Sequence, residues 1–199
     1  MIGKKVKEKI DGISAKKKYA WSQTKWIHKR FFMKPGKLLD LGAGLGIYSD
    51  TFRKLGYKVF SVDKEYTEIK LDLEKDNLPF EDESIDYCFC CHVIEHLNNP
   101  IKMIKESYRV LKNNGKLILI TPDFEAKPEH INLRSDHVKG YMKNELENVL
   151  KIFEKVNVFK FSNIPVVWRF TSLSFDYYWK WKNFLYLMAV CEKIRIDKK

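Results

Sequence analysis

The stretch Lys37-Leu-Leu-Asp-Leu-Gly-Ala-Gly-Leu-Gly46 decides the fold of this chain. Its first five residues are mostly apolar and predict a short buried strand, while Tyr48, Phe52 and Leu55 share one face of a helix that follows. Glycines between a strand and a helix let the backbone turn sharply and approach a ligand closely. Ile47 stands where a dinucleotide fingerprint needs glycine, and no phosphate-loop lysine follows. The alternative is a tight turn that binds nothing.

An acidic residue follows the second predicted strand. That strand covers 57–62 and ends on Asp63, which comes 21 positions after Gly42. A carboxylate at this place can accept hydrogen bonds from both hydroxyls of a ribose. Asp40 lies two residues before Gly42, and it either faces the ligand or fixes the loop as a hydrogen-bond acceptor.

The remaining pattern alternates strands with helices. Helices are predicted near 47–55, 101–111 and 143–152, and strands at 85–91, 116–121, 156–161 and 185–191. Such alternation predicts an α/β fold with a doubly wound, mostly parallel sheet and helices on both faces.

Charge is unevenly distributed along the 199 residues. The chain holds 37 Lys and Arg against 26 Asp and Glu, a formal charge of +11. Residues 1–30 carry 10 basic and 2 acidic side chains, and 193–199 carry 4 and 1, so 31–192 is neutral with 23 of each. We expect a basic helical arm or lid over 1–32 and a single domain over 33–199. Solvated lysines that only keep the protein soluble are the alternative.

The four cysteines and the apolar runs indicate a reduced, cytoplasmic location. Cys88, Cys90, Cys91 and Cys191 lie in apolar runs rather than in a secreted disulfide framework. No signal peptide is visible after Met1, and the apolar run 184–191 is too short to span a bilayer. The cysteine cluster lacks a second ligand pair, so we predict no metal site.

Several blocks together resemble the class I S-adenosylmethionine-dependent methyltransferases, most closely a small-molecule, type 11-like branch related to quinone-biosynthesis enzymes. The blocks are LDLGAGLG, SVDKE, LPFEDESIDYCFCCHVIEHLNNP and IKMIKESYRVLKNNGKLILITPD, which cover 37–123, with a weaker match to about 150. Asn113-Asn114 replaces the usual Pro-Gly, which changes a turn away from the cofactor. The resemblance implies a seven-stranded Rossmann-like sheet and S-adenosylmethionine as cofactor.

The resemblance also implies the residues that hold the cofactor. The glycine turn would hold its methionine end, Asp63 its ribose, the segment before LPF its adenine, and the end of the IDYCFCC strand its sulfonium. The implied residues are Asp40, Gly42, Ala43, Gly44, Gly46, Asp63, Lys64, Asp72, Leu73, Cys91 and His92.

Five side chains are candidates for acid–base catalysis, because methyl transfer to a hydroxyl or a protonated amine benefits from a base. They are His92, Glu95, His96, Tyr19 of the N-terminal arm, and His137. The alternatives are that Glu95 and His96 only begin or cap a helix, and that His137 is a surface residue.

The expected function is in-line methyl transfer to a small-molecule, lipid or sugar-linked acceptor. An aromatic insertion at 162–184 could cover an apolar acceptor, contact a membrane interface, stack on bases, form satellite core or make a dimer contact. RNA methylation by way of the basic arm and tail, and a cofactor-binding homologue without catalysis, are the alternatives. An anionic acceptor, RNA or peripheral membrane contact are possible partners, and no transmembrane segment is expected.

Overall fold

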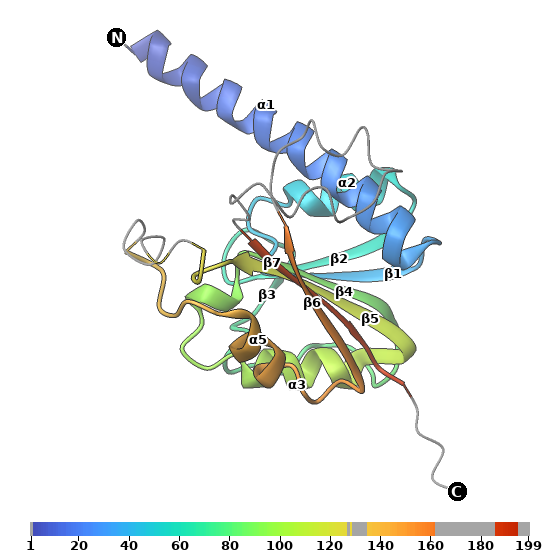
Figure 1. Ribbon diagram of the computed structural model, residues 1–199. Helices are drawn as coiled ribbons and strands as arrows, with labels where there is room; N and C mark the ends of the chain where they lie inside the picture. Colours follow the sequence, from blue (N-terminus) through green and yellow to red (C-terminus); the bar gives the residue numbers. More distant parts are fainter. Residues whose placement is uncertain (1, 127, 129–134, 162–185, 195–199) are drawn as a thin grey trace, which may run out of the picture.

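A seven-stranded sheet forms the centre of the chain in the computed structural model (Figure 1), which describes residues 2–126, 128, 135–161 and 186–194, with side chains from 14 onward. The strand order is β3-β2-β1-β4-β5-β7-β6, and β7 alone runs antiparallel to its neighbours. The strands are β1 (Lys37–Leu41), β2 (Lys58–Asp63), β3 (Ile69–Lys70), β4 (Ile85–Cys91), β5 (Leu111–Pro122), β6 (Lys155–Phe161) and β7 (Tyr186–Glu192). The predicted mostly parallel, seven-stranded sheet is confirmed.

Helices cover both faces of the sheet. The described helices are α1 (Ile2–Ile27), α2 (Ile47–Lys54), α3 (Ile101–Val110) and α5 (Lys143–Val149), with short turns η1 (His28–Phe32) and η2 (Ile94–His96). Figure 1 shows α1 and α2 on one face and α3 and α5 on the other. Two apolar clusters fill the two interfaces: Cys88 and Cys90 belong to the cluster on the α3 side, and Cys91 packs against the one on the α1 side. The alternation expected for a strand therefore holds in β4.

Some element boundaries differ from the sequence predictions. The two-residue strand β3 was not located, because so short a segment has no periodicity to detect. Strand β5 begins at Leu111, not 116, and residues 112–115 bulge out between two registers with β4. Helix α5 ends at Val149 and continues as turns. The predicted aromatic insertion at 162–184 lies outside the described residues.

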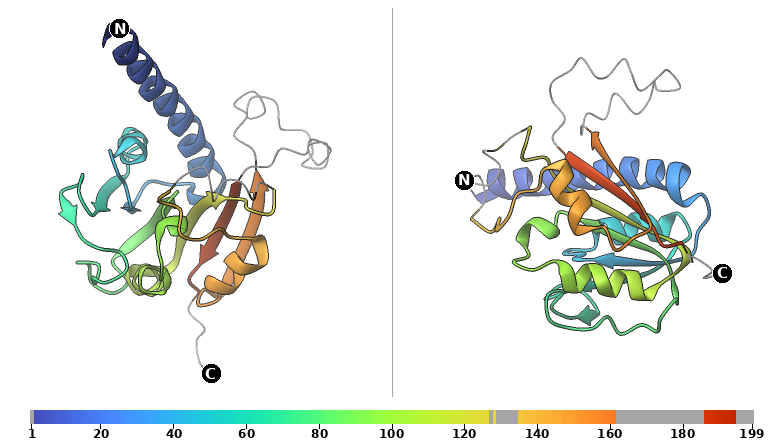
Figure 2. Two further views of the ribbon diagram at one scale, coloured as in Figure 1. Left: turned by 90° about the vertical axis from the view of Figure 1, so that its left-hand side faces the viewer. Right: turned by 60° about the horizontal axis from the view of Figure 1, so that its bottom comes forward.

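The basic N-terminal segment is one long helix that packs on α2. Its buried side chains, which face the domain, are Ala20, Gln23, Thr24 and Ile27, and the turn η1 follows before Pro35. The N-terminal end of α1 lies on the side where β5 ends (Figure 1) and projects away from the sheet (left view of Figure 2). In the part of the chain that is described, no helix is both long and apolar enough to cross a bilayer.

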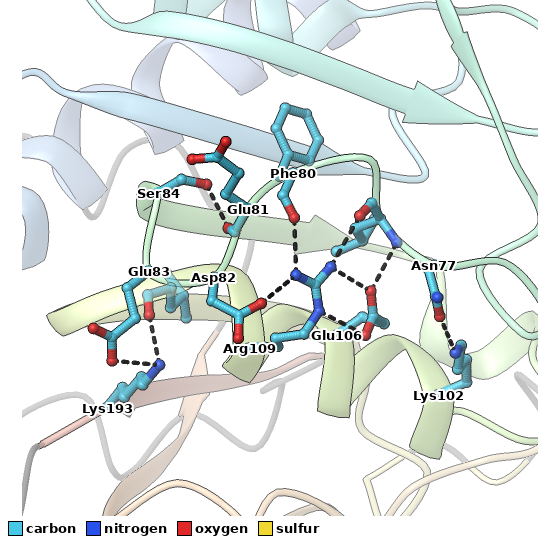
Figure 3. A network of polar contacts seen from close by, with 12 residues as sticks. Asn77, Phe80, Glu81, Asp82, Glu83, Ser84, Lys102, Glu106, Arg109 and Lys193 are labelled. Carbon is cyan, nitrogen blue, oxygen red and sulfur yellow. Dashed lines mark hydrogen bonds and ion pairs between the residues drawn. The ribbon is translucent and has the colours of Figure 1, made fainter.

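Arg109 of α3 fixes the loop that leads from β3 into β4 (Figure 3). Its guanidinium donates hydrogen bonds to the carbonyls of Leu78 and Phe80, to Asp82 at 2.7 Å and to Glu106 at 2.7 and 2.9 Å. Glu106 also accepts the Leu78 backbone N–H at 2.8 Å. Because Arg109 presents a planar fork of donors, one side chain can hold several loop acceptors at once.

Candidate active site

The glycine turn after β1 forms one wall of the candidate site. Gly42, Gly44 and Gly46 all have positive φ, at 66°, 51° and 71°, a region that residues with a Cβ rarely adopt. The backbone N–H groups of Gly42 and Ala43 both donate to the carbonyl of Val62, at 2.8 and 3.1 Å. These bonds hold the turn against the end of β2, and Gly46 begins α2.

Two of the glycines meet different surroundings. A Cβ on Gly42 would lie 2.4 Å from Val93 Cγ2, so the turn is packed tightly on that side. A Cβ on Gly44 would have no heavy atom within 4 Å. The turn is therefore closed towards the core and open at Gly44, as a site for a ligand requires.

Asp63 at the end of β2 lies directly beside this opening. Its Oδ2 accepts the Gly44 backbone N–H at 2.9 Å, and its Oδ1 accepts that of Glu65 at 3.3 Å. The carboxylate is partly exposed, so it keeps lone pairs that can accept further hydrogen bonds. Gly44 of the glycine turn and Asp63, which the sequence predicts near each other, are therefore in contact.

Asp40 is buried behind the turn. Ser49 of α2 donates to Asp40 Oδ2 at 2.5 Å, and Ser49 also contacts the hydroxyl of Ser61 at 2.8 Å. Burial raises the pKa of Asp40 to about 7, against the hydrogen bond from Ser49, which lowers it. This position fits the loop-fixing alternative for Asp40.

Lys64 and Asp72 lie together on the β3 side of the turn. Lys64 Nζ is 3.4 Å from Asp72 Oδ2, and Lys75 is 3.7 Å from the same oxygen. The Glu74 backbone N–H, at 2.9 Å, is the main cause of a lowered pKa for Asp72. Leu73 is buried beside this exposed pair.

The end of β4 forms the opposite wall. Burial raises the pKa of the Cys91 thiol, which packs next to Tyr48. His92 follows with a φ of 58°, and its backbone N–H donates to Ile120 of β5 at 2.9 Å. A positive φ is uncommon for a non-glycine residue and turns the His92 side chain away from the strand direction. Its side chain is 38% exposed, and its ring contacts Tyr186 edge-on at 5.2 Å.

Glu95 holds the His92 ring in place. His92 Nδ1 lies 3.1 Å from Glu95 Oε1, and the hydroxyl of Thr121 donates to Glu95 Oε2 at 3.0 Å. Burial alone would raise the pKa of the fully buried Glu95, but the hydrogen bond and charge of His92 outweigh it and lower the pKa. An ionised Glu95 makes Nδ1 the protonated nitrogen, so Nε2 is the one able to accept a proton.

His96 and His137 form a separate pair. Their rings are 4.9 Å apart, and His96 Nδ1 is 2.8 Å from the carbonyl of Asp136. Together with Glu95 they offer three metal-ligand atoms within 4.8 Å of one another. The absence of a metal therefore stays a prediction. The sequence analysis treats His92 and His96 as equal candidates. In the structure His92 makes a hydrogen-bonding contact with the Glu95 carboxylate, whereas His96 makes one with the carbonyl of Asp136.

Tyr19 of α1 is linked to α2 by hydrogen bonds through Gln23 and Tyr48, which the sequence analysis does not predict as site residues. Gln23 Nε2 donates to Tyr19 Oη at 2.9 Å, and Tyr48 of α2 donates to Gln23 Oε1 at 2.7 Å. Burial is the main cause of a raised pKa for Tyr19, and the nearby Cys91 and Tyr186 raise this pKa further, so Tyr19 stays protonated. The sequence hint to these hydrogen bonds is Gln23, a neutral polar residue among the lysines of this helix, which the structure shows to be buried.

Comparisons with known proteins agree with the fold. Residues 39–119 match the model of a family described as "Methyltransferase domain". A solved structure described as a SAM-dependent methyltransferase from Archaeoglobus fulgidus superposes with a TM-score of 0.67 at 15% identity, covering 87% of this chain and 94% of that one. The family match confirms the predicted resemblance, and the superposition confirms the fold.

Two curated relatives match over shorter stretches. An uncharacterized protein of Methanocaldococcus jannaschii is 37% identical over 89 residues, which are 42% of this chain and 43% of the relative. A ubiquinone biosynthesis O-methyltransferase of Pseudomonas entomophila is 26% identical over 115 residues, 48% of each chain. The chain thus spans about half the length of the curated relatives it matches.

Proposed function

With residues 39–119 taken as a methyltransferase domain of the S-adenosylmethionine-dependent class, we propose that this chain transfers a methyl group to a hydroxyl of a small molecule. The observation that carries the proposal is that two groups of residues, the two walls described above, lie at the same edge of the sheet. The open glycine turn after β1, with Asp63 of β2, forms one. The His92–Glu95 pair after β4, the strand next to β1, forms the other. Both lie at the carboxyl ends of parallel strands, where ligands bind in open α/β sheets.

The residues of the first wall fit the cofactor. The opening at Gly44 gives room for its methionine end against backbone, and the partly exposed Asp63 can accept hydrogen bonds from ribose hydroxyls. We assign the adenine to the neighbourhood of Lys64, Asp72 and Leu73, where an ion pair lies beside a buried apolar side chain. When bound, the cofactor supplies a methyl group on a sulfonium sulfur, which leaves as a neutral thioether.

The second wall supplies a base. We assign His92 Nε2 as the acceptor of the substrate hydroxyl proton, because Glu95 fixes Nδ1–H and stabilises the imidazolium that forms. The freed oxygen lone pair makes the new O–C bond as the C–S bond breaks. Tyr19, held by Gln23, can donate a hydrogen bond that orients the acceptor. The similarity to a ubiquinone O-methyltransferase supports a hydroxyl acceptor on a ring compound.

Cofactor binding is tested first by titration calorimetry with S-adenosylmethionine and S-adenosylhomocysteine. Asp63→Ala should weaken binding by about tenfold to a hundredfold, because it removes charge-assisted hydrogen bonds. The exposed Glu147 makes a long ion pair with Lys143 at 3.8 Å, so Glu147→Gln serves as a matched control with unchanged affinity. Equal affinities of wild type and Asp63→Ala would show that the site is wrongly assigned.

Catalysis is tested separately with labelled cofactor and a panel of catechols and quinols. Glu95→Gln removes the charge that orients His92, so kcat should fall by about a hundredfold or more while the cofactor affinity stays unchanged. The deficit should shrink as pH rises, since deprotonated acceptors need no base. Unchanged kcat in Glu95→Gln would contradict the assigned base without touching the cofactor site.

A further inference from the structure

The exposed face of α1 carries a strong and unbalanced charge. Between Ser14 and Arg30 the chain has six basic side chains and no acidic one. All six are exposed, and no ion pair joins any of them to another described residue. Several lysines elsewhere in the described residues do pair with acids, as Lys112 does with Asp86 at 2.7 Å. Uncompensated cations on one element mark it as a surface for an anionic partner.

These cations are arranged along one stripe. Lys18, Trp21, Lys25 and Lys29 are spaced by three, four and four residues, which places them on one side of the helix, opposite the buried Ala20-to-Ile27 face. Trp21 is 37% exposed, and Lys25 Nζ lies 5.7 Å from the centre of its ring. The stripe therefore combines ammonium groups with one amphipathic ring.

The form of this stripe favours a lipid surface over RNA. Proteins that bind single-stranded RNA use a basic groove with several stacking aromatics. The stripe runs along a projecting helix, holds a single aromatic ring, and belongs to a chain whose residues 31–192 are neutral. Lysines with a tryptophan at the same level match the headgroup region of an anionic bilayer.

We propose that α1 and the turn η1 dock the protein on anionic membranes, through Lys18, Trp21 and Lys25 of α1 and Lys29 of η1. The N-terminal end of α1 lies on the side where β5 ends (Figure 1). Tyr19 of α1 lies near Tyr186, whose ring contacts that of His92. The surface is independent of the cofactor site, so it can be tested without any methyl acceptor.

The test is co-sedimentation of the full chain with vesicles. Vesicles of phosphatidylcholine alone are compared with vesicles that hold roughly one quarter phosphatidylserine. We expect binding to the anionic vesicles only, and a partition coefficient lowered about a hundredfold in Lys18→Gln/Lys25→Gln/Lys29→Gln, since each lysine near the surface is worth about fivefold. Raising the salt should weaken binding of wild type far more than that of the variant.

Matched controls separate this surface from total charge and from folding. Lys70→Gln/Lys105→Gln/Lys151→Gln removes three exposed lysines on other elements and should bind vesicles as wild type does. Trp21→Ala should reduce the binding that persists at high salt. Both triple variants should keep the wild-type affinity for S-adenosylmethionine, so a failed cofactor site and a failed membrane surface give different results.

Three outcomes would overturn the proposal. They are equal binding to neutral and anionic vesicles, equal losses in the two triple variants, and displacement of the protein from vesicles by a single-stranded RNA that requires the same three lysines.

Discussion

Gly42 and Gly44 share a positive φ but differ in what surrounds them, and this difference predicts different costs for alanine. Gly42→Ala pays about 1–2 kcal/mol for a side chain in the left-handed region. It also places a Cβ 2.4 Å from Val93 Cγ2 in the core, and such overpacking costs about 1–3 kcal/mol. The free energy of unfolding should therefore fall by about 2–5 kcal/mol in total.

Gly44→Ala is the matched comparison. Its Cβ meets nothing within 4 Å, so only the backbone term of about 1–2 kcal/mol applies to stability. The new methyl group projects into the opening that we assign to the cofactor. Urea unfolding should then rank Gly42→Ala as the less stable variant, whereas calorimetry should show the larger loss of S-adenosylmethionine affinity in Gly44→Ala, corrected for unfolded protein.

A second substitution isolates the steric part. In a Val93→Ala background both offending methyl groups are gone, so adding Gly42→Ala should cost about 1–3 kcal/mol less than it does in wild type. Gly44→Ala should cost the same in both backgrounds. If Gly42→Ala and Gly44→Ala lose equal stability, or if the Val93→Ala background changes neither, the packing argument is refuted.

Two further predictions concern buried charge. Burial raises the pKa of Asp40 from 3.8 to about 7, so between these pH values the folded chain binds more protons than the unfolded chain and its stability falls as pH rises. Asp40→Asn should remove this dependence in urea unfolding measured from pH 4 to 7. Parallel stability profiles of wild type and variant would contradict the prediction. Arg109→Met leaves the buried Glu106 without its partner and should lower the free energy of unfolding by about 2–4 kcal/mol. Lys143→Met, which breaks an exposed ion pair, should lower it by under about 1 kcal/mol. Equal Tm shifts of the two variants would show that the Arg109 contacts do not stabilise the fold.

Local pattern was enough for the elements that build the glycine turn. Buried β1, the three glycines, α2 and the acid at the end of β2 are each visible in the sequence, because strand, turn and helix follow from neighbours within a few positions. The pairing of Gly44 with Asp63 could be inferred as well, since parallel strands bring their carboxyl ends to one edge. The strand β3 was missed because two residues carry no period.

The roles of the acid–base candidates depended on contacts between distant segments. Sequence spacing could name His92, Glu95 and His96 but could not choose among them. Our proposal of His92 rests on Thr121 of β5, which donates a hydrogen bond to Glu95, and on the 3.1 Å contact of His92 Nδ1 with the same carboxylate. Neither is visible in a local pattern, because hydrogen bonds between strands depend on register.

The sequence by itself determined an α/β sheet, a methyltransferase-like glycine turn and a neutral body with a basic arm, since these depend on local residue order and on summed charge. Only the tertiary structure decided that Asp40 is buried and accepts a hydrogen bond from Ser49 of α2, and that Gln23 links Tyr19 to Tyr48. It also decided that Lys18 and Lys25 of α1 and Lys29 of η1 lie exposed along one side with Trp21. Burial and orientation belong to side chains packed across elements, and the free energy of a charge or hydrogen bond depends on that environment.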